Sequence, residues 1–168
     1  MSARRVRTAQ KPAWRSRTLI TGGSIAAAIL ALILVIGAAQ TTASRQGADP
    51  NDARQVAQGR QVYAEKCASC HGANLEGQPD WKQELPEGGR TAPPHDQAGH
   101  TWHHPDAYLF AATKYGGQSV SPPDYKNNMP AFGETLSDQQ IWAVLAYIKS
   151  RWPPEIRQAQ REANERAR

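Results

Sequence analysis

The stretch Cys67-Ala68-Ser69-Cys70-His71 decides the fold of this chain. Two thiols three positions apart reach the two vinyl groups on one edge of a porphyrin, and a histidine directly after the second thiol then lies under the ring. The spacing therefore predicts one covalently attached haem c, with thioether bonds to Cys67 and Cys70 and with His71 as an axial ligand of the iron.

Two other uses of paired cysteines fit this chain less well. A thioredoxin-like dithiol is expected beside a βαβ pattern, and no strand-like alternation surrounds the motif. A zinc site built from paired cysteines needs a second C-x-x-C, and the chain contains only two cysteines. Covalent haem attachment is therefore the favoured interpretation.

An electron carrier with a six-coordinate haem needs a second axial ligand. The chain contains two methionines, of which Met1 lies before the expected membrane span, and Met129 lies in a loop between Asn128 and Pro130. A thioether is a soft donor that favours ferrous iron and raises the reduction potential. We expect Met129 to be this ligand, with an ordinary core methionine as the alternative.

The sequence predicts three short helices, over residues 52–66, 104–115 and 137–152. Asp52 is a suitable N-cap for the first, and Ser137 begins the third with the S-x-x-Q spacing of a capping box. Three helices of this length bury little apolar surface, so we expect the haem to complete the core.

Four motifs follow one another in a recognisable order: Gly59-x-x-x-Tyr63, Cys67-x-x-Cys70-His71-Gly72, Met129-Pro130-x-Phe132 and an aromatic helix from Trp142 to Tyr147. In this combination the chain resembles the class I c-type cytochromes, specifically a membrane-anchored bacterial form with a single haem. The resemblance covers roughly residues 52–152. It implies an all-α cytochrome c fold of three or more helices wrapped around one covalently bound haem, preceded by one N-terminal transmembrane helix.

The resemblance also implies roles for residues around the haem. In this family a proline carbonyl accepts the Nδ1–H of the axial histidine, and Pro93 and Pro94 are the candidates. A tryptophan before the middle helix bonds a haem propionate, which Trp102 matches, with simple packing against the haem edge as the alternative. Arg90 is a candidate partner of a propionate, with plain surface exposure as the alternative.

In the same family the first and last helices cross nearly perpendicularly, and a glycine on one lets an aromatic side chain of the other approach. Gly59 and Tyr147 fit these roles. The alternative is a tolerated mid-helix glycine, which costs up to ~1 kcal/mol relative to alanine.

The charge of the chain is unevenly distributed. The net charge of +5 comes from 20 basic and 15 acidic residues, and residues 1–17 contain six of the basic residues and no acidic one. Residues 18–168 therefore have a net charge of −1. This distribution argues against nucleic acid as a partner, because the basic character belongs to one end of the chain.

Residues 18–39 are long and apolar enough to form a transmembrane anchor, with a cleaved signal peptide as the alternative. The basic arm 1–17 then stays in the cytoplasm, and everything after the span is exported. Residues 40–51 form a polar linker, residues 52–152 the cytochrome c domain, and residues 153–168 a polar C-terminal tail, for which a helix is compatible with the sequence but which has no apolar face to bury. The expected location is the bacterial inner (cytoplasmic) membrane, with a single pass and a periplasmic haem domain.

Four of the five histidines lie in one loop, at His95, His100, His103 and His104. Three interpretations remain open. In the first, one of these histidines, such as His95, replaces Met129 as the second axial ligand. In the second, the cluster binds copper or zinc. In the third, the side chains bond propionates and loop carbonyls or lie at the surface. We favour the third.

The leading functional hypothesis is one-electron transfer and not catalysis. The protein would carry electrons between membrane respiratory complexes, from a quinol-oxidising complex to a terminal oxidase, with the anchor keeping it near both. A fixed haem subunit of a respiratory or oxidase complex is the alternative, with the tail as a docking element. A haem enzyme or sensor with a displaceable sixth ligand is less favoured.

Overall fold

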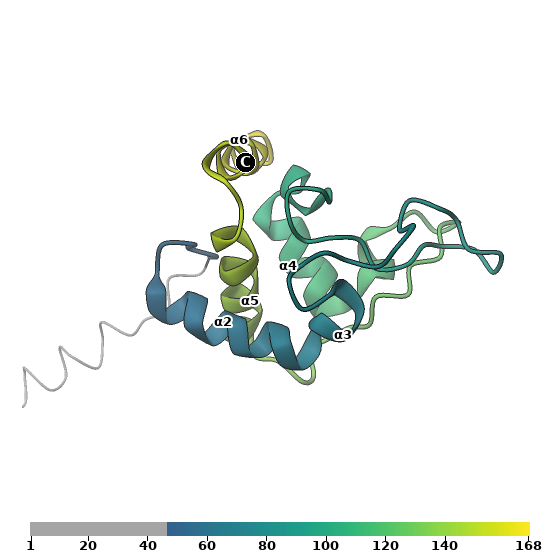
Figure 1. Cartoon of the computed structure of the whole chain (residues 1–168), viewed down its shortest axis with the longest axis horizontal. Helices are drawn as coiled ribbons and strands as arrows, with labels where there is room; N and C mark the ends of the chain where they lie inside the picture. The colour runs from purple at the N-terminus through teal and green to yellow at the C-terminus, as the bar shows by residue number, and fades with distance from the viewer. Residues whose placement is uncertain (1–46) are drawn as a thin grey trace, which may run out of the picture. The chain divides into compact units, whose positions relative to one another are not determined.

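The computed structural model describes residues 47–168 (Figure 1). The basic arm, the expected membrane span and residues 40–46 of the linker lie outside the described residues, so those interpretations stay predictions. Among the helices of residues 47–168, none combines the length and the apolar character that crossing a bilayer requires. This part of the chain contains no strand, so the domain is all-helical as expected.

The first described helix, α2 (Ala53–Lys66), begins where the sequence predicts. The carboxylate of Asp52 accepts hydrogen bonds from the backbone N–H groups of Arg54 and Gln55 at 2.9 and 3.1 Å. This N-cap satisfies donors that the first turn of a helix leaves without partners. The helix ends at Cys67, and the single turn α3 (Ala68–His71) follows at once.

Helix α5 (Asp138–Ser150) supplies most of the apolar core. Its capping box is formed: Gln140 N donates to Ser137 Oγ at 3.3 Å, and Ser137 N donates back to Gln140 Oε1 at 2.9 Å. The predicted apolar stripe is buried, comprising Ile141, Val144, Leu145 and Ile148.

Helices α2 and α5 cross closely. In Figure 1, α2 runs horizontally and α5 runs vertically across it. A Cβ placed on Gly59 would lie 1.9 Å from Ala143 O and 2.9 Å from Tyr147 Cβ, both on α5. The expectation that a glycine permits this crossing is therefore confirmed, and the backbone of Ala143 approaches it more closely than Tyr147 does.

Helix α4 (Asp106–Tyr115) lies alongside α5, with Lys114 paired to Asp138 at the start of α5 and Asp106 paired to Lys149 near its end. The rings of Phe110 and Trp142 stack between the two helices with centroids 4.3 Å apart. The helix ends at Gly116, whose φ of +87° is readily adopted only by glycine. The short 3₁₀ helix η2 (Gly117–Val120) continues the chain, and a similar one, η1 (Thr101–His103), precedes α4.

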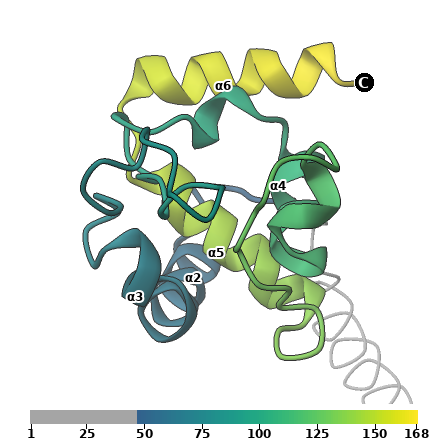
Figure 2. The same ribbon diagram turned by 90° about the vertical axis from the view of Figure 1, so that its right-hand side faces the viewer.

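The C-terminal segment differs from its prediction. Instead of a tail with nothing to bury, residues 154–166 form helix α6 (Pro154–Arg166), which lies across the top of the molecule in Figure 2. Gln160 has no exposed surface and Ala163 is 4% exposed. Apolar periodicity missed this face because the contacts of its most buried residue are polar, namely the Gln160 amide to His104 O and to Asp106 Oδ1.

Candidate functional site

The paired-cysteine motif forms the junction of α2 and α3. Cys67 ends α2 and is half-buried, Cys70 is exposed on α3, and His71 is 8% exposed at the end of that turn. The Tyr63 hydroxyl, itself buried, donates to Gly72 O at 2.9 Å and fixes the end of the turn. The two thiols thus lie near the surface while the histidine side chain lies inside.

The environment of the thiols argues against a reactive dithiol. Burial, and secondarily the nearby Cys70, raises the pKa of the Cys67 thiol to about 11. Redox-active cysteine pairs need the opposite, a lowered pKa that provides thiolate at neutral pH. Between residues 47 and 168 no three histidine, cysteine, aspartate or glutamate side chains are grouped to hold a metal ion, which also disfavours the zinc interpretation.

The orientation of the His71 ring is set by a single hydrogen bond. Its Nδ1 lies 2.8 Å from Pro93 O, and because a carbonyl oxygen only accepts, Nδ1 must carry the proton. Nε2 then keeps its lone pair. Burial lowers the pKa of His71 despite the opposing effect of this hydrogen bond, so the ring is neutral at pH 7. A neutral imidazole with a bonded second nitrogen is the form that binds metals.

The hydrogen bond also decides between the two prolines. Pro93 is the partner of His71, and the other candidate, Pro94, does not take this role. Pro94 is buried and turns its carbonyl toward Thr101, whose hydroxyl lies 3.5 Å away, and toward Gly99, where a Cβ would lie 2.0 Å from the same oxygen. The peptide planes of successive prolines point in different directions, so only one of them can face the histidine.

Met129 lies in the loop between η2 and α5, which is held by hydrogen bonds to the start of η2 and to a neighbouring side chain. Its backbone oxygen accepts from Gly117 N at 3.0 Å, and its own N–H donates to Asn127 Oδ1 at 3.1 Å. A further backbone bond, from Phe132 N to Thr113 O at 3.1 Å, ties the same loop to α4. Figure 2 shows α4 on the other side of the domain from α3, so the two expected iron ligands come from separate elements.

Two buried polar atoms indicate a missing partner inside the domain. In the described residues, Trp102 Nε1 and Thr91 Oγ1 are buried without any hydrogen-bond partner. An unpaired buried donor costs about 1–3 kcal/mol, so such atoms usually have a partner when the protein is complete. Haem propionates are strong acceptors, and these two donors fit them. The sequence pointed to Trp102 but not to Thr91, because nothing in the sequence marks a single threonine.

The remaining predicted contact, Arg90, is exposed on the loop that follows α3. Burial lowers the pKa of His100, and the positive charges of His103 and Arg90 lower it further. The Arg90 side chain makes no hydrogen bond or ion pair with another described residue.

His95 does not occupy the position of a second axial ligand. Its ring stacks on His71 with centroids 3.9 Å apart and planes 22° apart. Two imidazoles on opposite sides of one metal must lie end to end, with about 4 Å between the donor nitrogens alone. Side-by-side stacking excludes that arrangement. The backbone oxygen of His95 accepts from Trp152 Nε1 at 2.7 Å, which fixes the loop beside His71.

The other loop histidines pack against aromatic rings. His100 stacks on Trp81 with centroids 5.5 Å apart, and His104 stacks on Tyr108 at 4.2 Å. His103 stacks on Trp102 at 3.6 Å. These contacts are those that the packing interpretation of the loop expects.

Comparisons with known proteins agree with this site. The family model for cytochrome c matches residues 56–152, more than half of the chain. The thiosulfate dehydrogenase of Stutzerimonas stutzeri (strain A1501) is 32% identical over 107 residues, which cover 63% of this chain and 30% of that relative. The matched part thus spans less than a third of the relative's length. No solved structure matches. With the haem motif, the oriented histidine and the family model in agreement, the chain belongs to the cytochrome c family.

Proposed function

We propose that this protein is a one-electron carrier that binds a single haem c between His71 and Met129. The observation that carries the proposal is the orientation of His71, whose Nδ1 proton is held by Pro93 O at 2.8 Å, leaving Nε2 free for iron. When bound, the haem supplies the one-electron redox chemistry. Cys67 and Cys70 hold it by thioether bonds, which the family membership supports.

The ligand pair supports a carrier over an enzyme. If both His71 and Met129 held the haem iron, no ligand position would remain open for a substrate. The backbone bonds from Gly117 and the Asn127 side chain hold the Met129 loop in place and oppose displacement of this ligand. A thioether ligand also raises the reduction potential, which suits an acceptor of electrons from a quinol-oxidising complex.

The partners and location are part of the same proposal. We place the domain on the periplasmic side of a bacterial inner membrane, anchored by residues 18–39, between a quinol-oxidising complex and a terminal oxidase. Residues 47–168 contain 13 basic and 15 acidic side chains, a net charge of −2 to which haem propionates add. A partner with a positive or apolar docking surface is therefore favoured.

Absorption and haemochrome spectra of the purified full-length protein test the core of the proposal. We expect a c-type haemochrome, a weak methionine–iron charge-transfer band in the ferric state, and no carbon monoxide binding to the ferrous protein at neutral pH. Met129→Ala should remove the band and admit carbon monoxide. Absence of covalent haem would overturn the proposal, and carbon monoxide binding by the unaltered protein would favour a sensor or enzyme.

A second candidate follows from the similarity to a thiosulfate dehydrogenase. This chain would then be a fixed haem subunit of a larger oxidising system, and not a mobile carrier. The test adds thiosulfate to the purified ferric holoprotein and follows haem reduction. The carrier proposal expects no reduction by thiosulfate alone, and reduction at a substantial rate would favour the second candidate.

A further inference from the structure

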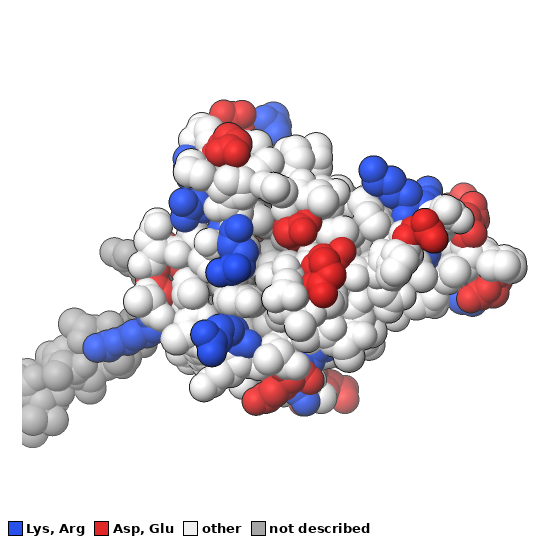
Figure 3. Space-filling model, viewed as in Figure 1, with Lys and Arg blue, Asp and Glu red and all other residues white. Residues whose placement is uncertain are grey.

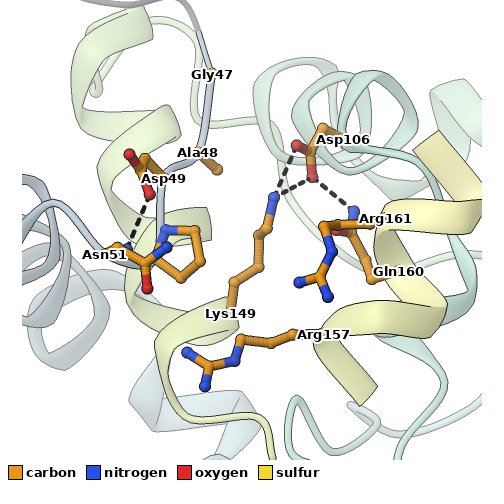
Figure 4. Close-up of a pocket in the computed structure, with 10 residues that line it drawn as sticks. Gly47, Ala48, Asp49, Asn51, Asp106, Lys149, Arg157, Gln160 and Arg161 are labelled. Carbon is orange, nitrogen blue, oxygen red and sulfur yellow. Dashed lines mark hydrogen bonds and ion pairs between the residues drawn. The ribbon is translucent and has the colours of Figure 1, made fainter. Parts of the chain in front are cut away.

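A cavity of about 380 Å³ lies between the segment 47–51, α5 and α6 (Figure 4). Lys149 of α5 and the α6 residues Arg157 and Arg161 contribute basic groups to its lining. A neighbouring cavity of about 230 Å³ is lined by the same two arginines together with Asn51. The same pair of guanidinium groups therefore lines both cavities.

The charge of the lysine is already compensated. Lys149 Nζ lies 2.9 and 2.8 Å from the two carboxylate oxygens of Asp106, and Gln160 Nε2 donates to the same carboxylate at 2.7 Å. Figure 4 shows this ion pair side by side with the two arginines. Because the lysine and the aspartate neutralise each other, the cavity keeps the two positive charges of the arginines against the single negative charge of Asp49.

The two guanidinium groups have no acidic partner among residues 47–168. Neither takes part in an ion pair within 4.0 Å there, and Arg161 donates only to the neutral amide oxygen of Gln158, at 3.2 Å from Nε. A spacing of four residues places Arg157 and Arg161 on one face of α6. The carboxylate of Asp49 lies on the opposite wall, where it accepts from Asn51 N at 2.9 Å.

Two uncompensated guanidinium groups at one cavity match an anion with several oxygens. Guanidinium presents its donors as a planar fork that binds phosphate oxygens in pairs. The segment 47–51 forms one wall, and only residues 40–46 separate it from the expected membrane span. Seven residues reach at most about 25 Å, so the cavity lies within reach of the bilayer surface.

We propose that this cavity binds the phosphate of an anionic phospholipid headgroup and thereby fixes the orientation of the haem domain at the membrane. The proposal rests on the proposed anchor. It also accounts for a basic site in a domain whose net charge of −2 would otherwise be repelled by an anionic leaflet. Held in one orientation, the haem domain would present the same face to partners in the same membrane.

Calorimetric titration of the full-length holoprotein in a neutral detergent tests the site. The probes are dihexanoyl-phosphatidylglycerol, dihexanoyl-phosphatidylcholine and inorganic phosphate. We expect phosphatidylglycerol to bind and phosphatidylcholine not to bind. The R157Q/R161Q variant should weaken phosphatidylglycerol binding about tenfold or more, since each lost charge-assisted bond contributes over a factor of ten. R166Q/R168Q removes the same charge from the exposed end of the chain and should change it less than twofold.

Equal binding of the two lipids, or equal effects of the two double variants, would overturn the proposal. Inorganic phosphate binding as tightly as phosphatidylglycerol would overturn the lipid assignment and identify a free-phosphate site. Carbonate extraction of membranes tests the anchor separately. A protein released by carbonate that still binds phosphatidylglycerol through the arginines would refute the anchor and leave the headgroup site standing.

Discussion

Gly59→Ala tests whether the crossing of α2 and α5 depends on the absence of a side chain. The added Cβ would lie 1.9 Å from Ala143 O, 2.5 Å from Ala143 C and 2.9 Å from Tyr147 Cβ. Ordinary Cβ contacts begin at 3.4 Å, so the helices would have to separate by about 1.5 Å. The nearest atoms belong to the backbone of α5, which no rotamer change can move away.

The magnitude follows from two opposing effects on the free energy of unfolding. Overpacking a close-packed interior costs about 1–3 kcal/mol, and a clash with backbone belongs at the upper end of that range. Alanine in place of glycine in mid-helix gains up to ~1 kcal/mol. We therefore expect Gly59→Ala to lower the stability by about 2 kcal/mol, which lowers Tm by about 8 °C in a domain of this size.

Urea unfolding of the holoprotein, followed by circular dichroism and by the Soret band, measures this change. Ala57→Gly is the matched control, because Ala57 is exposed on the same helix and responds only to helix propensity. The control should lose about 1 kcal/mol. If Gly59→Ala instead stabilised the protein, the glycine would be a tolerated helix residue and the close crossing would not restrict it.

Three further changes are expected to have measurable effects. Lys149→Met leaves the partly buried carboxylate of Asp106 without its cation and should lower the free energy of unfolding in urea by about 2 kcal/mol. Lys114→Met, at a more exposed ion pair, should lower it far less. Equal losses of stability in the two variants would contradict this difference. Burial lowers the pKa of His104, so the stability that this residue contributes is complete above its unfolded pKa of about 6.5 and falls as the pH drops toward the folded value. The urea midpoint should therefore be lower at pH 5 than at pH 7. This difference should be smaller in His104→Phe, because phenylalanine stacks but does not titrate. Trp102→Phe removes a buried donor, so the reduction potential should become more pH-dependent between pH 5 and 8, while an unchanged profile would remove Trp102 from the propionate site.

The helix starts and the haem motif could be predicted from the sequence because they depend on residues that are close together in the chain. Asp52 and the Ser137 capping box begin helices where they were expected to, because each cap is made by residues within three positions of each other. Gly59 was assigned correctly because the family resemblance named its partner helix. The haem motif is likewise local, since its two cysteines and its histidine share one turn, α3, and the residue before it.

The pairing of distant residues could not be predicted with the same certainty. Pro93 and Pro94 are equivalent in the sequence, and only the path of the loop turns the Pro93 carbonyl toward His71, 22 residues away. His95 was a candidate ligand until its ring was found stacked on His71. Nothing in the sequence marks Thr91, because burial without a partner is a property of the folded domain.

The C-terminal segment shows the same division. By itself the sequence determined that Pro153 and Pro154 end one helix, and its polar composition predicted a tail with nothing to bury. The tertiary structure decided that α6 packs on the domain, because the carbonyl of His104 and the carboxylate of Asp106, more than 50 positions earlier, give Gln160 the partners it needs to be buried. The local order of residues determined where helices begin and where the haem motif lies. Burial of polar groups depended on partners that only the folded chain brings within hydrogen-bonding distance.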